Sequence, residues 1–260
     1  MLFEVCCDCV ESALNAAKGG AKRIELCSSL KAGGLTPSSG LIQVVCDALR
    51  KHFPQQDVQV FVMLRPRPGD FTYSEDEVET MVLDCEEAAK RGARGVVFGL
   101  LRADGRVDEE GCRRLVSKCR EHDLDTTFHR AIDFVASDIL AALTTLSDLG
   151  VRRVLTGGRK PTAIEGQETI GAMIDHVRRA NLKMTIMAGG GLHSGNVAAF
   201  LATFSAEHLE GDGLELHGSL KGTRQSEANY CWDADEAKAE FGQHWVTDPL
   251  QVARVCNDLE

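Results

Sequence analysis

Short apolar runs rich in β-branched residues alternate with longer amphipathic stretches along the whole chain. The short runs have the length and composition of buried strands, and the longer stretches repeat their apolar residues at helical spacing. Strands are predicted over residues 2–6, 23–27, 58–63, 95–99, 126–129, 153–156, 184–188 and 213–217. Helices are predicted over residues 10–18, 38–51, 74–91, 108–122, 137–149, 165–180, 196–204 and 248–259.

This alternation predicts the fold class. Strands that alternate with helices form parallel sheets, and eight such units match an α/β fold of the (β/α)8 TIM-type barrel. An open doubly wound sheet is the alternative, but it favours a G-x-G-x-x-G turn after the first strand, where this chain has Cys6-Cys7-Asp8-Cys9. We expect one domain over residues 1–260, with a polar excursion from the barrel rim at about 219–243.

Alternate residues of a strand face the same side, which predicts what points into the barrel. Three pairs of polar residues share a face in this way: Glu4 and Cys6, Glu25 and Cys27, and Glu215 and His217. The residues between them are apolar and suit packing against the outer helices. We therefore expect the polar residues to point inward, near the C-terminal strand ends where barrels bind their ligands.

Ionised carboxylates inside a barrel need partners. The nearest predicted partners are Arg65, Arg67, His129 and Arg130. One interpretation is a structural charge network that only closes the top of the barrel. The other is a functional site, because such groups tend to gather where chemistry occurs.

Composition narrows the range of partners. A net charge of -10 argues against nucleic-acid binding, since nucleic-acid binders usually carry a basic face. The N-terminus resembles no secretory signal, and no apolar run approaches the roughly 20 residues of a membrane span. We therefore expect a cytoplasmic protein without a membrane partner. In that compartment the 10 cysteines stay reduced and serve as core residues, reactive thiols or metal ligands.

Cys6 and Cys27 differ from the other cysteines because they end adjacent predicted strands on the inward face. Thiolates favour Cu(I) and Zn(II), and the absence of a paired C-x-x-C argues against a closed tetrahedral zinc site. Two soft ligands are enough for Cu(I), and Met63 is a soft neighbour. Cys6 and Cys27 are therefore predicted as Cu(I) ligands, with packing in the core as the alternative.

A run of glycines after the seventh predicted strand suggests an anion site. Barrels often hold a phosphate with the loops after strands seven and eight. Gly190, Gly191 and His217 lie at those positions, and Arg67 is a candidate counter-charge. A tight turn explains the glycines equally well.

Glu25, His129 and Arg65 are the candidates for acid–base chemistry, because they combine a carboxylate, an imidazole and a cation at strand ends. This set supports an alternative function: an enzyme of unknown substrate that acts on a small molecule bearing a phosphate or carboxylate. A third interpretation is an inert rim on a protein that acts through its surface.

Several motifs in sequence order resemble the copper homeostasis protein CutC family. They include Phe3-Glu4-Val5-Cys6, Ile24-Glu25-Leu26-Cys27-Ser28, Met63-Leu64-Arg65-Pro66-Arg67, Thr127-Phe128-His129-Arg130-Ala131 and Met187-Ala188-Gly189-Gly190-Gly191. The resemblance covers about residues 2–219. It implies a cytoplasmic TIM-type barrel, an association with copper tolerance and a homo-oligomer. It also implies Cu(I) binding, assigned in some members to the thiols that match Cys6 and Cys27.

The resemblance is incomplete in two places. The family often has Ser-Ala-Arg or Cys-Ser-Ala-Arg after the eighth strand, where this chain has Gly218-Ser219-Leu220-Lys221, so the third thiol that the cysteine would supply is missing here. Ile132 stands where the family usually has Phe, which we interpret as a packing exchange.

Overall fold

The computed structural model of the chain describes residues 1–209, 211, 213–225 and 243–259. Eight parallel strands close into a barrel in sequence order, with β8 hydrogen-bonded to β1. The strands are β1 (Phe3–Cys7), β2 (Arg23–Leu26), β3 (Gln59–Met63), β4 (Gly95–Phe98), β5 (Asp125–Phe128), β6 (Arg153–Thr156), β7 (Thr185–Gly189) and β8 (Leu214–Gly218). The prediction of a (β/α)8 barrel is confirmed, and each strand end lies within one residue of its predicted position.

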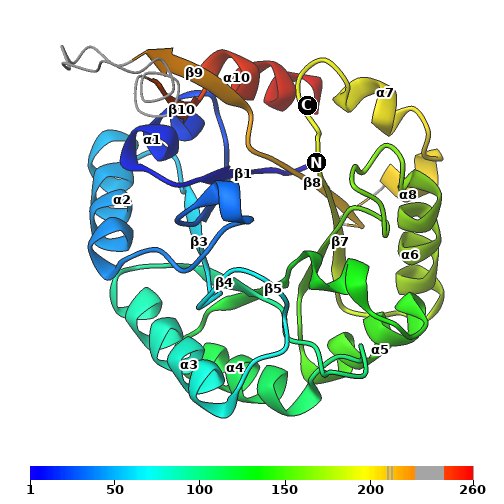
Figure 1. Ribbon diagram of the computed structural model, residues 1–260. Coiled ribbons are helices and arrows are strands. Elements are labelled where there is room, and N and C mark those ends of the chain that lie inside the picture. The colour runs from blue at the N-terminus through cyan, green and yellow to red at the C-terminus, as the bar shows by residue number, and fades with distance from the viewer. Residues whose placement is uncertain (210, 212, 226–242, 260) are drawn as a thin grey trace, which may run out of the picture.

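Helices surround the barrel, as the view in Figure 1 shows. They are α1 (Val10–Lys18), α2 (Ser39–His52), α3 (Glu75–Lys90), α4 (Glu109–Glu121), α5 (Ile139–Leu149), α6 (Gln167–Arg179), α7 (Val197–Leu201), α8 (Ala206–Leu209) and α10 (Pro249–Asp258). Two short 3₁₀ helices, η1 (Leu30–Ala32) and η2 (Arg130–Phe134), lie in the loops after β2 and β5. Seven of the eight predicted helices begin and end within two residues of the predicted bounds, and α1 matches its prediction at both ends.

The exception is the helix predicted over 196–204, which is shorter than expected. α7 ends at Leu201, and the hydroxyl of Thr203 donates a hydrogen bond to the carbonyl of Phe200 at 2.7 Å. The Ser205 hydroxyl then accepts the N–H of His208, and the separate helix α8 forms. Thr and Ser side chains compete with the helical backbone in this way, which the apolar spacing does not reveal.

The apolar face of the strands packs outward, as the alternation predicts. Val5, Ile24 and Leu216 are fully buried in the large core cluster between barrel and helices. A second, smaller cluster lies inside the barrel and consists of Cys27, Phe61, Met63 and Val97. Strand parity therefore separates the outer core from the barrel interior.

A buried charge layer fills the barrel interior below the mouth. Arg23 Nε donates to Glu4 Oε2 at 2.5 Å, and the Arg23 guanidinium also pairs with Glu215. Arg153 Nε donates to the same Glu215 carboxylate at 2.5 Å. Both guanidiniums stack on the ring of Phe61, at 5.1 and 5.3 Å from its centroid.

The sequence predicted Arg65, Arg67, His129 and Arg130 as the nearest partners of the inward carboxylates. The structure corrects part of this prediction. Arg65, Arg67 and Arg130 make no ion pair with Glu4 or Glu215. The cations come instead from Arg23 and Arg153, the first residues of β2 and β6, and Arg23 lies directly beside Glu4 in the β1–β2 register.

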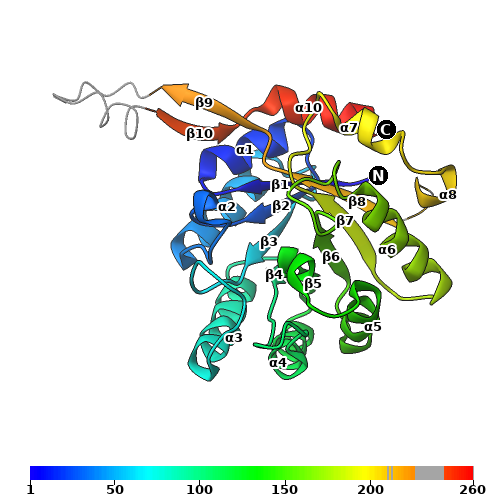
Figure 2. The same cartoon turned by 45° about the vertical axis from the view of Figure 1, so that its right-hand side comes forward.

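Two strands stand apart from the barrel. β9 (Lys221–Gln225) and β10 (Gln243–Thr247) pair antiparallel and project from the ring of helices (Figure 2). The polar excursion predicted at 219–243 thus includes β9, and residues 226–242 lie outside the described residues. No helix in the described part of the chain combines the length and apolar character that crossing a membrane requires.

Candidate functional site

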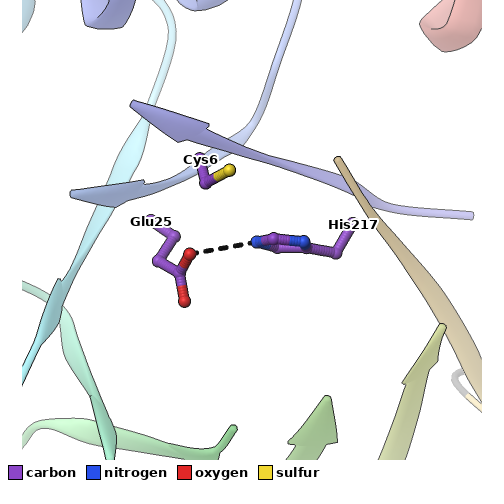
Figure 3. Close-up of side chains that lie close together, drawn as sticks. All are labelled: Cys6, Glu25 and His217. Atoms are coloured by element: carbon purple, nitrogen blue, oxygen red, sulfur yellow. Dashed lines mark hydrogen bonds and ion pairs between the residues drawn. The ribbon is translucent and has the colours of Figure 1, made fainter. Parts of the chain in front are cut away.

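Three neighbouring strands bring Cys6, Glu25 and His217 together at the mouth of the barrel (Figure 3). The strands are β8, β1 and β2, and the β1–β2 register pairs Cys6 directly with Glu25. One ligand atom from each side chain, a thiol sulfur, a carboxylate oxygen and a ring nitrogen, lies within 4.8 Å of the other two. The closure of the barrel therefore places side chains from both ends of the chain in one group.

Glu25 and His217 form a buried ion pair. His217 Nε2 lies 3.1 Å from Glu25 Oε2 and 3.7 Å from Glu4 Oε1. Burial disfavours both charges, yet Glu25 raises the pKa of His217 well above its ordinary value, and His217 lowers the pKa of Glu25. The pair is therefore an imidazolium next to a carboxylate.

Cys27 lies beside this group rather than in it. Its thiol donates to Glu25 Oε2 at 3.6 Å and packs in the interior cluster with Phe61 and Met63. Burial, together with the charge of Glu25, raises the pKa of Cys27 well above its ordinary value. Cys6 is only partly buried and lines the cavity described next.

A cavity of about 620 Å³ opens at the C-terminal ends of the strands, where the sequence predicted a site. Seven of the nine predicted site residues line it: Cys6, Glu25, Arg65, His129, Gly190, Gly191 and His217. The other two, Cys27 and Arg67, do not. The loops contribute further apolar residues that no sequence pattern singled out, among them Phe134.

His129 follows β5 and is held by the local backbone. Its Nδ1 accepts the N–H of Ala131 at 3.1 Å, which begins η2. A Cβ on Gly99 would lie 2.4 Å from the imidazole, so only glycine leaves room for this ring. Burial and the nearby Arg65 lower the pKa of His129 to about 4, although the charge of Glu25 opposes this. His129 is neutral at pH 7.

Arg65 and Arg67 have different roles although they are two residues apart. The terminal nitrogens of Arg65 donate to the carbonyls of Ala32 and Gly69 at 2.9 and 2.8 Å, which ties two loops to the rim. Arg67 instead pairs with Glu77 at 2.6 Å, outside the cavity. Arg65 is 6% exposed, and its guanidinium is a fixed cation in the wall.

The glycines after β7 form part of the opposite wall. Gly190 has a φ of 110°, and a Cβ there would lie 2.9 Å from the carbonyl oxygen of Pro161. Glycine is therefore required for this turn, which places backbone rather than side chains next to the cavity. Lys221, the first residue of β9, also lines the cavity and adds a cation.

Comparison with known proteins finds relatives that match most of this chain and three quarters or more of their own length. The copper homeostasis protein cutC homolog of Mus musculus is 47% identical over 257 residues, which cover 96% of this chain and 86% of the mouse protein. The protein of the same name from Homo sapiens is 46% identical over 226 residues, covering 86% of this chain and 75% of the human protein. A family protein CutC of Vibrio vulnificus (strain YJ016) is 41% identical over 256 residues, covering 98% and 95% of the two chains.

Solved structures have a similar fold. A CutC protein from Streptococcus agalactiae superposes with a TM-score of 0.72 at 28% identity, covering 84% of this chain and 98% of the other. Thiamine phosphate pyrophosphorylase from Pyrococcus furiosus gives a TM-score of 0.54 at 17% identity, over 99% and 94% of the two chains, which is a likeness of fold alone. Residues 1–219 match the CutC family. The chain therefore belongs to the CutC family.

Proposed function

We propose that this protein binds Cu(I) at the mouth of its barrel, with Cys6 and His217 as ligands and Glu25 beside them. The observation that carries the proposal is the group of three ligand atoms within 4.8 Å of one another. The names of the mouse and human relatives, both copper homeostasis proteins, support the choice of metal.

The donor set suits copper chemically. Thiolate and imidazole are good ligands for Cu(I), whereas a carboxylate is a harder ligand that contributes mainly charge. Glu25 keeps one oxygen, Oε1, without a hydrogen-bond partner among the described residues, and its negative charge offsets that of a bound cation. Copper is the cargo here, and Cys6, Glu25 and His217 all line an open cavity, which leaves a route for its entry.

Cys27 is the second thiol in this proposal. Its sulfur lies 3.6 Å from Glu25 Oε2, next to the three ligand atoms but not among them. Its burial makes the thiolate costly, which favours His217 as the partner of Cys6 and leaves Cys27 as the alternative ligand.

An anaerobic Cu(I) titration in competition with a chromogenic chelator tests these assignments. We expect Cys6→Ala and His217→Gln each to weaken Cu(I) binding by at least about tenfold, the loss expected when one of two main ligands is removed. Cys46→Ala is the matched control, because Cys46 is a buried thiol in α2 and does not line the cavity. Equal affinity in the wild type, Cys6→Ala and His217→Gln would overturn the proposal.

X-ray absorption at the copper edge distinguishes the two partners of Cys6. One sulfur and one nitrogen ligand, with no change in Cys27→Ala, identify Cys6 and His217. Two sulfur ligands that become one in Cys27→Ala identify Cys6 and Cys27.

A further inference from the structure

Three buried polar atoms that line the cavity lack a hydrogen-bond partner among the described residues. They are Glu25 Oε1, Arg65 Nε and His129 Nε2, and their side chains belong to residues that are 3%, 6% and 5% exposed. Buried polar groups in folded proteins are nearly always paired, because an unpaired one keeps its full desolvation cost. Three such atoms around one cavity therefore point to a partner that fills it.

The three atoms define what that partner must offer. Arg65 Nε is an N–H donor, and His129 Nε2 carries a hydrogen because Nδ1 accepts the N–H of Ala131. Glu25 Oε1 is an acceptor, and Figure 3 shows it pointing away from His217. The ligand thus needs acceptors for two N–H groups and a donor for one carboxylate oxygen.

Two of the three side chains lie against the same aromatic ring. The Arg65 guanidinium lies over the Phe71 ring, 5.2 Å from its centroid, and the His129 imidazole contacts that ring as well. A single small molecule that packs on Phe71 therefore lies next to both Arg65 and His129.

The outer part of the cavity is apolar and aromatic. The Phe71 ring lies 5.0 Å from the imidazole of His129 and 5.7 Å from the ring of Phe134. Phe134 is 65% exposed, so one side of its ring is open to a ligand in the cavity. An aromatic or aliphatic group of a ligand would cover it.

We propose that this cavity binds a small organic anion with a hydroxyl group next to its carboxylate and an apolar or aromatic body. The two carboxylate oxygens accept from Arg65 Nε and His129 Nε2, the hydroxyl donates to Glu25 Oε1, and the body packs on Phe71 and Phe134. A carboxylate fits better than a phosphate, because its two oxygens match the two N–H donors, Arg65 Nε and His129 Nε2. This proposal goes beyond copper binding.

Mandelate is a suitable probe, since it combines all three features. Calorimetric titration of the metal-free protein, with a chelator present, compares it with three molecules that each lack one feature: phenylacetate has no hydroxyl, glycolate has no ring, and 1-phenylethane-1,2-diol has no carboxylate. We expect mandelate to bind at least about tenfold more tightly than each of them, because a site built to pair a polar group discriminates strongly against its absence.

Variants locate the site. His129→Asn keeps an acceptor for the Ala131 N–H but removes Nε2, and Phe134→Ala removes an exposed ring without disturbing the core. We expect both to weaken mandelate binding by at least about tenfold, the cost of one good contact. Arg67→Lys is the control, because Arg67 pairs with Glu77 outside the cavity, and we expect it to bind mandelate as the wild type does.

The proposal is overturned if mandelate does not bind, or if it binds no better than phenylacetate. Either result means that ordered water alone satisfies the three atoms. Because copper is excluded from these titrations, failure here leaves the Cu(I) proposal untouched, and loss of Cu(I) binding in Cys6→Ala leaves this one untouched.

Discussion

His129 is a buried imidazole that is uncharged and whose orientation is fixed by the backbone. The N–H of Ala131 holds Nδ1, and the absence of a side chain at Gly99 makes room for the ring. The orientation of the ring thus depends on its own loop and on the residue after β4, whereas its neutral state depends on burial and on Arg65.

The stability of the protein should fall in mild acid because of His129. Its pKa is about 4 in the folded state against an ordinary value of 6.5, so the unfolded chain binds the extra proton between these values. This contribution to stability is therefore fully present above pH 6.5 and is lost as the pH falls toward 4, by about 3 kcal/mol in total. Urea unfolding over this range measures it. The His129→Asn variant should show a shallower pH dependence, and an identical one would contradict this prediction.

The affinity for Cu(I) should depend on pH above neutrality, whereas the effect of His129 on stability lies below it. His217 holds a proton on the nitrogen that faces Glu25, and its pKa lies well above the ordinary value. A metal ion at that nitrogen must displace the proton, so Cu(I) affinity should rise with pH from neutrality upward. Competition titrations at several pH values measure the trend. His217→Gln should be less sensitive to pH, and a wild-type affinity that is flat with pH would argue against His217 as a ligand.

The sequence predicted the positions of these side chains better than their partners. The alternation of each strand placed Cys6, Glu25 and His217 on the inward face, because the strand period is two in any sheet. The alternation did not distinguish Cys27 from these three residues, because Cys27 lies on the same face of its strand as Glu25. The difference arises from depth and neighbours: the Cys27 thiol is enclosed by the side chains of the interior cluster, whose packing is set by the whole barrel.

At the scale of the elements, the helix starts are well specified. Ser74 accepts the N–H of Glu77 and donates its own N–H to the Glu77 carboxylate, a capping box that begins α3. The same Glu77 binds Arg67, so the start of α3 also anchors the loop after β3. Signals of this kind lie within a few residues of one another, which is why the strand and helix bounds could be predicted from the sequence. The seventh helix is the exception, because Thr203 and Ser205 divide it through side-chain hydrogen bonds.

Removing the capping box should lower the free energy of unfolding measurably. Ser74→Ala loses the side-chain acceptor for the Glu77 N–H, and we expect a loss of about 1 kcal/mol in the free energy of unfolding. Ser39→Ala is the control, because Ser39 is exposed at the start of α2 while Ser38 caps that helix. Chemical denaturation of both variants measures the difference. Equal stabilities would mean that α3 does not depend on its cap.

At the scale of the whole molecule, the buried charge layer links strands from distant parts of the chain. Arg23 of β2 joins Glu4 of β1 to Glu215 of β8, and Arg153 of β6 reaches the same Glu215. The sequence placed both carboxylates inside the barrel, but the height of each residue along the axis depends on the stagger of all eight strands. The arginines that meet them therefore became evident only in the assembled barrel.

Arg23→Met tests the layer. Methionine keeps an apolar side chain of similar length but leaves Glu4 and Glu215 short of a partner in the interior, so we expect a loss of about 3–5 kcal/mol in unfolding free energy. Arg50→Met is the control, because its pair with Asp47 is exposed, and we expect a change within about 1 kcal/mol. Denaturant unfolding distinguishes the two. Similar losses in both variants would contradict the difference between buried and exposed pairs.

The pairing of β8 with β1 has a consequence for the protein during its synthesis. Cys6 and Glu25 emerge from the ribosome early, whereas His217 follows almost two hundred residues later. A nascent chain released before residue 217 has both early side chains but no imidazole to complete the group. If Cys6 and His217 hold copper as proposed, prematurely terminated chains lack one of the two ligands, and we expect them not to compete with the full-length protein for the metal.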